Sequence, residues 1–466
     1  MIAIAANRFK EFQRKRMEIF GELAKRFWRG EINDHTDLDK LADEIRDKYG
    51  FQEAEITFIK DHIRIAMGLD PRGTPDFADE IELVKNSPKI LKPIVAKVDE
   101  ACKHCSPDER TCKDVCKYEA NVYRREGPVI EDDKCLSCGE CVTSCDFGAL
   151  ADKIEFIPLI SWLQNEHTDV YAAVAPAIVG QFGENIAMGQ LRTALKILGF
   201  KDMIEVALFA DILTIKEAFE FNRLVKTEQD FFLTSCCCPV WLNLTKKNYP
   251  EIFAHMSPSV SPMIAAGRIL KKLYQDAKVV FISPCIAKKA EVQEPDLKGD
   301  IDFVISFPEL KEIFTVLDIN LAELSPENKD QASFAGRVYA RAGGVSFSVK
   351  TVVNRIEPRR LIKLKARKVA GVKACKDILD KLSQGEKIQE NFIEGMGCEG
   401  GCVGGPRTNI AKERATALVN EFGEDSLIMT PFDNLNVMKI LSQLGIGNIE
   451  EIVENEELRK LLTRVY

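Results

Sequence analysis

The sequence predicts a mixed α/β protein with three parts: a small helical domain, a short cysteine-rich segment and a large α/β domain. Three observations favour this class. Apolar residues recur at helical spacing over residues 1–97, eight of the 15 cysteines fall within residues 98–152, and strand-like runs alternate with helical stretches over residues 153–466. A chain of 466 residues also has room for roughly three domains of about 150 residues each.

The first part, residues 1–97, contains no cysteine and is predicted to be helical. Its apolar positions include Phe9 and Phe12, followed by a run at Ile19, Leu23 and Phe27. Residues 34–37 are suited to capping a helix, and the Gly- and Pro-rich stretch at 68–75 is typical of a loop. Because this part offers no set of metal or catalytic residues, we interpret it as a packing or docking module.

Composition narrows the possible function classes. The net charge of −8 and the pI of about 5.5 disfavour a nucleic-acid-binding protein, which needs a basic face. No apolar run approaches the roughly 18 residues of a membrane-spanning helix, and residues 1–20 lack the pattern of a signal peptide. A cytoplasmic protein is therefore expected. Since cytosolic thiols stay reduced, its cysteines indicate metal or redox chemistry rather than disulfides.

The cysteine-rich segment, residues 98–152, carries two related cysteine patterns. Cys135, Cys138, Cys141 and Cys145 follow C-x2-C-x2-C-x3-C, the spacing of bacterial ferredoxins. Cys102, Cys105, Cys112 and Cys116 repeat this frame with four residues added between the second and third cysteines.

In two-cluster ferredoxins the fourth cysteine of each run binds the other cluster. We therefore expect one [4Fe-4S] cluster at Cys135, Cys138, Cys141 and Cys116, and another at Cys102, Cys105, Cys112 and Cys145. Zinc is the alternative, because four thiolates also suit that ion. Two interlocked quartets favour the ferredoxin-like arrangement, in which His104 is a solvated side chain rather than a ligand.

The large domain has predicted strands at 170–175, 279–283 and 302–306, and most of its cysteines lie in three separate loops. Residues 234–241 contain Cys236, Cys237 and Cys238, residues 283–291 contain Cys285, and residues 394–406 contain Cys398 and Cys402. Four thiolates from three distant loops can hold a further cluster between two lobes, and the adjoining glycines allow close backbone approach. Cys375, on a predicted helix, is interpreted as a core residue.

At these three loops the chain resembles the [FeFe]-hydrogenases, and the resemblance covers about residues 98–466. It implies a two-lobed α/β catalytic domain over residues 153–466. That domain would hold the H-cluster, a [4Fe-4S] cluster linked through one cysteine to a two-iron unit with CO, CN and azadithiolate ligands. The implied cluster ligands are Cys238, Cys285, Cys398 and the bridging Cys402, and Lys288 corresponds to the lysine that binds a cyanide. A buried ammonium group needs such an anionic partner.

The chain departs from the family pattern at several positions beside the implied two-iron unit. The first motif normally has two adjacent cysteines, one relaying protons and one binding iron, whereas this chain has three. Aligning on Cys-Pro-x-Trp makes Cys238 the ligand and Cys237 the relay, and leaves Cys236 unexplained. Aligning on Thr-Ser shifts both roles by one residue. The other positions implied to contact the cofactor are Ser283, where the family has methionine, and Met396, Pro176 and Ala177.

The resemblance also implies a proton relay. Glu217 and Glu220 correspond to the two proton-carrying glutamates of the family, and Ser257 corresponds to its relay serine. Residues three apart share a helix face, so the two glutamates are expected side by side. The alternative interpretation is a pair of solvated surface acids.

The function implied is reversible conversion of protons and electrons to H2. Electrons would pass between a soluble carrier such as ferredoxin and the H-cluster through two accessory [4Fe-4S] clusters, and maturation proteins would supply the two-iron unit. Two alternatives stay open: an H2-sensing hydrogenase of low turnover, and a non-enzymatic relative from iron-sulfur assembly that keeps similar cysteines. No nucleic-acid or membrane partner is expected.

Overall fold

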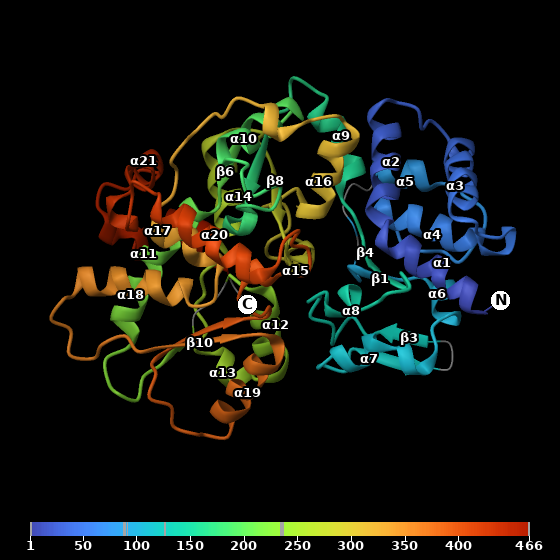
Figure 1. Ribbon diagram of the computed structural model, residues 1–466. Helices are drawn as coiled ribbons and strands as arrows, with labels where there is room; N and C mark the ends of the chain where they lie inside the picture. Colours follow the sequence, from blue (N-terminus) through green and yellow to red (C-terminus); the bar gives the residue numbers. More distant parts are fainter. Residues whose placement is uncertain (1, 87–89, 91, 125–126, 234–236, 465–466) are drawn as a thin grey trace. The chain divides into compact units, whose positions relative to one another are not determined.

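The computed structural model describes the chain except residues 1, 87–89, 91, 125–126, 234–236 and 465–466 (Figure 1). The chain divides into two compact units. The first unit comprises Met1–His167, Cys285–Ala290 and Phe303–Asn320, and the second comprises Thr168–Pro284, Glu291–Asp302 and Leu321–Tyr466. The sequence divisions expected at residues 97 and 152 both fall inside the first unit.

The first unit begins with the predicted helices, drawn in blue in Figure 1. They are α1 (Ile2–Arg14), α2 (Arg16–Trp28), α3 (His35–Tyr49), α4 (Ile56–Ala66) and α5 (Glu80–Asn86). The Asp34 carboxylate caps α3 by accepting a hydrogen bond from the Thr36 N–H, and Gly50 ends that helix with a φ of 67°. The stretch at 68–75 is a loop, as its Gly and Pro content predicts.

Aromatic side chains form the centre of this helical part. Phe9 and Phe12 are fully buried, and their rings lie 4.7 Å from the Phe58 ring. The His104 ring stacks on Phe9 at 4.4 Å, so the core reaches the cysteine-rich segment directly. His104 is therefore part of a packed contact, which corrects the expectation of a freely solvated side chain.

The cysteine-rich segment contains only short elements because it has few apolar residues to bury. In chain order they are β1 (Val95–Lys97), α6 (Asp99–Lys103), α7 (Thr111–Val115), β2 (Asn121–Arg124), β3 (Gly127–Ile130), α8 (Glu140–Thr143) and β4 (Leu150–Asp152). β1 pairs antiparallel with β4, and β2 pairs antiparallel with β3. Each half of the segment is thus a strand, one or two short helices and a second strand.

Four further elements complete the first unit: α9 (Phe156–Leu163), α15 (Ile286–Glu291), β9 (Phe303–Ser306) and α16 (Phe307–Val316). Helix α16 packs against α2 where α2 carries Gly21. A Cβ at Gly21 would lie 2.5 Å from the Glu312 carboxylate, so glycine allows these two helices to approach closely.

A parallel sheet forms the first half of the second unit. Its strands β5 (Val170–Val174), β6 (Asp202–Glu205) and β8 (Lys278–Ser283) lie in the order β6-β5-β8. All of β5 is buried, as expected for a parallel strand covered on both faces. The helices of this half are α10 (Met188–Ile197), α11 (Ala207–Leu224) and α14 (Pro262–Leu273).

A second parallel sheet, which the sequence did not predict, has the order β10-β11-β7, with strands β10 (Ala366–Ala370), β11 (Phe392–Met396) and β7 (Phe232–Leu233). Its neighbours include α12 (Pro239–Asn248), α18 (Gly344–Ile356) and α19 (Val372–Ser383). Beyond it follow α20 (Lys412–Glu424), α21 (Leu435–Gln443) and α22 (Glu456–Leu462). The mixed α/β class is thereby confirmed. Among the described residues, no helix is long and apolar enough to cross a membrane.

Candidate metal centres and proton relay

The structure brings seven of the eight cysteines of residues 98–152 into two groups. The pKa of Cys102 is raised to about 12 and that of Cys105 to about 11, first by burial and also by the nearby Cys145 and Cys112 thiolates. In the other group, burial raises the pKa of Cys138 to about 12, and Cys135 and Cys116 add to the effect. These neighbours are the ones that crossed ligation requires.

No three His, Cys, Asp or Glu side chains of the described residues converge closely enough to hold a single metal ion. A [4Fe-4S] cluster binds each thiolate to a different iron and so needs wider spacing than one zinc ion. The backbone also suits a sulfur-rich site. The Ser137 N–H donates to Cys135 Sγ at 3.4 Å, and Gly139 begins α8 with a φ of 82°.

The first and third motifs meet in the second unit. Cys238 is the N-cap of α12, and its Sγ accepts a hydrogen bond from the Gly397 N–H at 3.2 Å. Gly395 lies against the fully buried Trp241, and a Cβ there would come within 2.1 Å of the indole ring. The glycines of the third motif are therefore needed to bring Cys238 beside the strand that precedes Cys398.

The third motif continues as a tight turn after β11. Gly400 and Gly401 have φ values of 82° and 93°, and Cys402 then begins a short 3-10 helix. Cys402 is exposed, whereas Cys398 is half-buried. Cys375 is buried beside this turn and donates to the Met396 carbonyl at 3.3 Å, which confirms its interpretation as a core residue.

The carboxyl ends of β5 and β8 hold three more of the predicted residues, Pro176, Ala177 and Ser283. Ala177 and Ser283 are buried, and Pro176 and Pro284 adjoin them in the chain. The Arg407 N–H, just beyond the third motif, donates to the Pro284 carbonyl at 3.0 Å. Loops at the carboxyl ends of adjacent parallel strands are a common position for a ligand site.

The second motif enters the first unit at Cys285 and forms α15. Ile286 and Ala290 of this helix pack in one buried cluster with Cys112, against which Cys141 and Cys145 also lie. The motif that carries Cys285 and Lys288 thus packs on the same apolar core as the cysteine-rich segment. Lys288 is 7% exposed.

Lys289 is a buried lysine that sequence reasoning missed. Its ammonium donates to Glu309 at 2.8 Å and to Asp152 at 3.3 Å, and Asp152 also accepts from Arg16 of α2 at 2.9 Å. Burial alone would lower the pKa of Lys289, but these two carboxylates outweigh it and the pKa is raised. The ion network fixes α15 to the helical part of the first unit.

The predicted relay glutamates lie buried on α11. Glu217 is 1% exposed and Glu220 is 6% exposed, so the alternative of two solvated surface acids is wrong. The fully buried Ser257 donates to Glu220 Oε2 at 3.2 Å. Cys237, the next predicted member, is half-buried and packs against the apolar cluster that contains Phe221. Cys236 lies outside the described residues.

Two residues beside this relay had no counterpart in the sequence-based prediction. Lys216 is 1% exposed and donates to Glu220 Oε1 at 2.6 Å and to Ser259 Oγ at 2.7 Å. The Ser257 and Ser259 hydroxyl oxygens lie 2.9 Å apart. Because the single Ser257 proton goes to Glu220, Ser259 donates to Ser257 Oγ, which closes a ring of four hydrogen-bonded side chains. A lysine within an otherwise apolar helical run was the only signal in the sequence.

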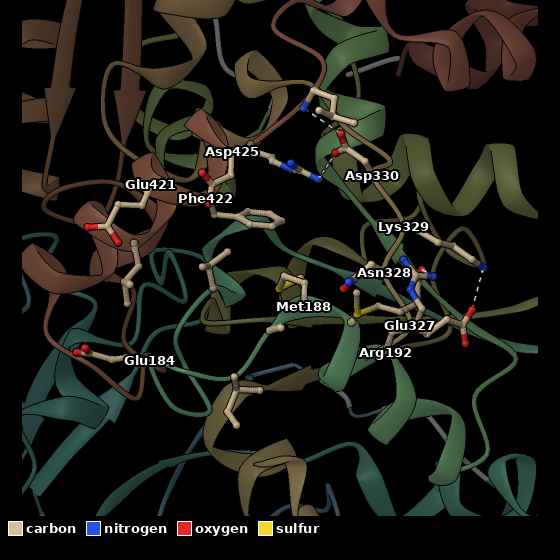
Figure 2. Close-up of a pocket in the computed structure, with 18 residues that line it drawn as sticks. Glu184, Met188, Arg192, Glu327, Asn328, Lys329, Asp330, Glu421, Phe422 and Asp425 are labelled. Carbon is tan, nitrogen blue, oxygen red and sulfur yellow. Dashed lines mark hydrogen bonds and ion pairs between the residues drawn. The ribbon is translucent and has the colours of Figure 1, made fainter. Parts of the chain in front are cut away.

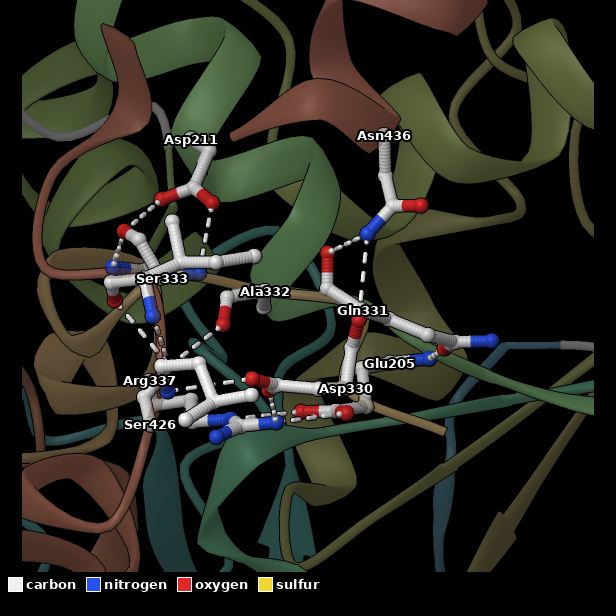
Figure 3. A network of polar contacts seen from close by, with 12 residues as sticks. Glu205, Asp211, Asp330, Gln331, Ala332, Ser333, Arg337, Ser426 and Asn436 are labelled. Carbon is white, nitrogen blue, oxygen red and sulfur yellow. Dashed lines mark hydrogen bonds and ion pairs between the residues drawn. The ribbon is translucent and has the colours of Figure 1, made fainter. Parts of the chain in front are cut away.

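Helix α11 is anchored at its other end by a buried polar network (Figure 3). The Asp211 carboxylate accepts from the Ser333 backbone N–H and from Asn434 Nδ2, each at 2.8 Å. Nearby, Arg337 forms a two-pronged ion pair with Glu205, which ends β6. Figure 3 shows Asp211 pointing from the helix toward Ser333.

Two cavities in the second unit each have a volume of about 580 Å³. One lies beside α10 and α20 and is lined by residues including Arg192, Glu327 and Phe422 (Figure 2), but by none of the predicted site residues. The other is lined at one side by Lys216 and Glu220, so it adjoins the relay.

Comparison with known proteins places the catalytic motifs in one family. Residues 168–406 match the family described as "Iron only hydrogenase large subunit, C-terminal domain". The chain is 27% identical to iron hydrogenase 1 of Clostridium pasteurianum, over 73% of each chain. It is also 27% identical to the NADP-reducing hydrogenase subunit HndD of Solidesulfovibrio fructosivorans, over 68% of this chain and 64% of that subunit.

More distant similarity extends to a different class of protein. A probable cytosolic Fe-S cluster assembly factor of Drosophila mojavensis is 22% identical over 58% of this chain and 70% of its own. Among solved structures, an [FeFe]-hydrogenase of Chlamydomonas reinhardtii aligns with a TM-score of 0.55 and 20% identity, covering 65% of this chain and 95% of that one. That structural likeness supports the fold.

Proposed function

Because the chain belongs to the iron-only hydrogenase large-subunit family, we propose that it catalyses the reversible reaction 2 H+ + 2 e− ⇌ H2. The observation that carries this proposal is the pair of buried glutamates on α11. Glu217 and Glu220 are both withdrawn from solvent, and Glu220 contacts Ser257 in the order expected for proton transfer. Burying a carboxyl group costs free energy of folding, so two such groups at these positions favour a proton path over a purely structural role.

Four cysteines of the three motifs would form the donor set of an H-cluster. Cys238, Cys285, Cys398 and Cys402 would supply its four thiolates, with Cys402 as the bridge to the two-iron unit. The Gly397 N–H already donates to Cys238 Sγ, and such bonds stabilise a thiolate bound to iron. When bound, the cluster supplies the redox-active iron and a site where protons and electrons combine.

The chain's own residues would hold the cofactor and deliver protons. Lys288 would offer its ammonium group to a cyanide ligand, and Met396, Ser283, Pro176 and Ala177 would line the surroundings of the two-iron unit. Cys237 would exchange a proton with Glu217, and Ser257 would pass it on to Glu220. In each transfer the two groups must lie within hydrogen-bond distance of one another or share one bridging water. The last step, from Ser257 to Glu220, meets this condition at 3.2 Å.

Electrons would reach the site through two accessory [4Fe-4S] clusters. Cys102, Cys105, Cys112 and Cys145 would hold one, and Cys116, Cys135, Cys138 and Cys141 the other. The shared apolar core of this segment and α15 gives a short covalent and packed route to Cys285. A ferredoxin or similar soluble carrier would exchange electrons with these clusters, and dedicated maturation proteins would install the two-iron unit.

An iron-sulfur assembly role is the second candidate, supported by the 22% identity to an assembly factor of Drosophila mojavensis. The two candidates differ in the two-iron unit, which only a hydrogenase needs. Infrared spectroscopy of protein produced with the maturation proteins tests this directly. We expect absorption bands of iron-bound CO and CN together with H2 turnover. Protein with full iron-sulfur content but no such bands would favour the assembly role.

A further inference from the structure

We infer that the cavity beside Lys216 and Glu220 is a binding site for a doubly charged oxyanion, of the phosphate class, at the outer end of the relay. We call it the outlet pocket. Its six cationic lining residues are Lys216, Arg223, Arg268, Arg459, Lys460 and Arg464, and its two acidic ones are Glu220 and Asp296. The binding site follows from these residues alone, whereas its connection to proton transfer rests on the proposed function.

The ion pairs around the outlet pocket show which charges are already neutralised. Arg464 forms a two-pronged pair with Asp296 at 2.9 and 2.8 Å, and Arg268 pairs with Asp300 at 2.8 Å. Lys216 pairs with Glu220 at 2.6 Å, and Lys460 with Glu456 at 3.0 Å. Four of the six cations thus each have a carboxylate partner.

The two cations left over are arginines. Arg223 follows Glu220 on α11, and Arg459 lies on α22; both are exposed. The guanidinium group of neither arginine forms a hydrogen bond or an ion pair with a described residue, so the pocket carries about two positive charges in excess. A guanidinium group presents its N–H donors in a planar fork that matches the oxygens of phosphate. A dianion would therefore balance the excess.

Hydrogen bonds between separate segments hold the walls of the outlet pocket in place. The Arg464 N–H donates to the Pro258 carbonyl at 2.9 Å, and the Val260 N–H donates to the Leu462 carbonyl at 3.0 Å, so the segment after α22 runs along the segment that carries Ser259. Arg268 Nη1 donates to the carbonyls of Lys460 and Thr463 at 3.0 and 2.8 Å. The volume of about 580 Å³ is within the usual range of small-molecule sites, roughly 300–1,000 Å³.

An anion bound in the outlet pocket would affect the proposed relay at the buried end of the pocket, where Lys216 and Glu220 lie. Lys216 has three ammonium donors, of which Glu220 and Ser259 receive two. The third is available to an anion because Lys216 lines the pocket. A bound dianion would stand between Glu220 and solvent and repel negative charge on that carboxylate, so we expect it to slow proton exchange.

Inorganic phosphate is the probe, titrated by calorimetry into the anaerobic, cluster-loaded protein at ionic strength held constant with chloride. We expect saturable binding at one site, weakened at least tenfold in the double variant Arg223→Ala/Arg459→Ala. Arg359→Ala, which removes an exposed arginine outside the pocket, is the matched control and should stay within twofold. Non-saturable binding, or an unchanged affinity in the double variant, would overturn the inference.

A second measurement tests the position of the site. Saturating phosphate should slow H2 turnover at least twofold in the unaltered protein and leave the double variant unaffected. Binding without slowing would show that the anion does not sit at the relay outlet. If the protein had no hydrogenase activity at all, the calorimetric result would still decide whether the anion site exists.

Discussion

At the scale of single residues, the three consecutive cysteines of the first motif are the feature that family resemblance leaves open. The structure supports Cys238 as the ligand, because its sulfur accepts from the Gly397 N–H and it caps α12. Cys237 then lies one residue earlier, packed near Phe221 of α11. On this basis we propose the proton-relay role for Cys237 and none for Cys236.

The assignment predicts opposite results for two alanine variants. Cys237→Ala should lower H2 turnover by about 10²- to 10⁴-fold, the usual contribution of a positioned acid or base, and should leave iron content unchanged. Cys236→Ala should stay within about twofold of the unaltered protein, since no relay role falls to it. Turnover assays with parallel iron determination check both, and a reversed pattern would show that the roles are shifted by one residue.

At the scale of elements, α11 is the structure on which the relay depends. Its buried face carries Glu217 and Glu220 along with Lys216, and its Asp211 is tied to the segments that contain Ser333 and Asn434 (Figure 3). Complete burial raises the pKa of Asp211 to about 6 despite these hydrogen bonds. The anchor of this helix is therefore sensitive to pH in the range where the enzyme would work.

The sign of that sensitivity follows from the raised pKa. A carboxyl group that is easier to protonate in the folded state stabilises fully below its unfolded pKa of about 4, and that stabilisation is lost as the pH rises through about 6. The complete change is about 3 kcal/mol, of which roughly 1.4 kcal/mol falls between about pH 5 and pH 8.

Asp211→Asn removes this titration and keeps the hydrogen bonds, because the amide oxygen can accept from Ser333 N–H and Asn434 while the amide N–H donates to Ser333 Oγ. We expect the difference in unfolding free energy between variant and unaltered protein to shift in favour of the variant by about 1.4 kcal/mol from pH 5 to pH 8. Thermal unfolding at several pH values measures it. A difference that stays constant with pH would mean that Asp211 is ionised throughout.

At the scale of the whole molecule, the proposed function needs both units: electron transfer in the first and the buried proton relay in the second. The Lys289, Asp152 and Arg16 network connects the second motif to the helical part of the first unit. Residues 1–97 therefore stabilise the surroundings of Cys285, and this is the kind of packing role expected for them from the sequence.

Loss of one accessory cluster should lower H2 turnover more with a protein electron carrier than with a small dye. Cys138→Ser removes a half-buried thiol that the cluster at Cys116, Cys135, Cys138 and Cys141 would need. We expect H2 evolution driven by ferredoxin to fall at least tenfold and evolution driven by reduced methyl viologen to fall less, since a small dye can reach other electron entry points. Equal losses with both donors, measured by gas chromatography, would argue against a chain of clusters serving the carrier.

The sequence by itself determined the chemistry of the sites and the class of the fold. The proposed cluster ligands from Cys135 to Cys145 follow one another at short spacings, and such spacings can be recognised in the sequence whatever the fold. Likewise the buried strand at 170–174 is apolar throughout, so its place in a covered parallel sheet could be predicted from local pattern. The apolar spacing at Phe9 and Phe12 identified the N-terminal helices for the same reason.

Only the tertiary structure decided which polar residues are buried and how they are paired. Lys216 meets Ser259 across 43 residues of chain, and Lys289 meets Asp152 across 137. A lysine or glutamate in sequence is typical of a solvated surface, and its burial depends on a partner that local pattern cannot reveal. The outlet pocket and the ring around Glu220 arise in this way. Hydrogen bonds and ion pairs are chosen by three-dimensional proximity, whereas thiolate spacing is fixed by covalent bonds.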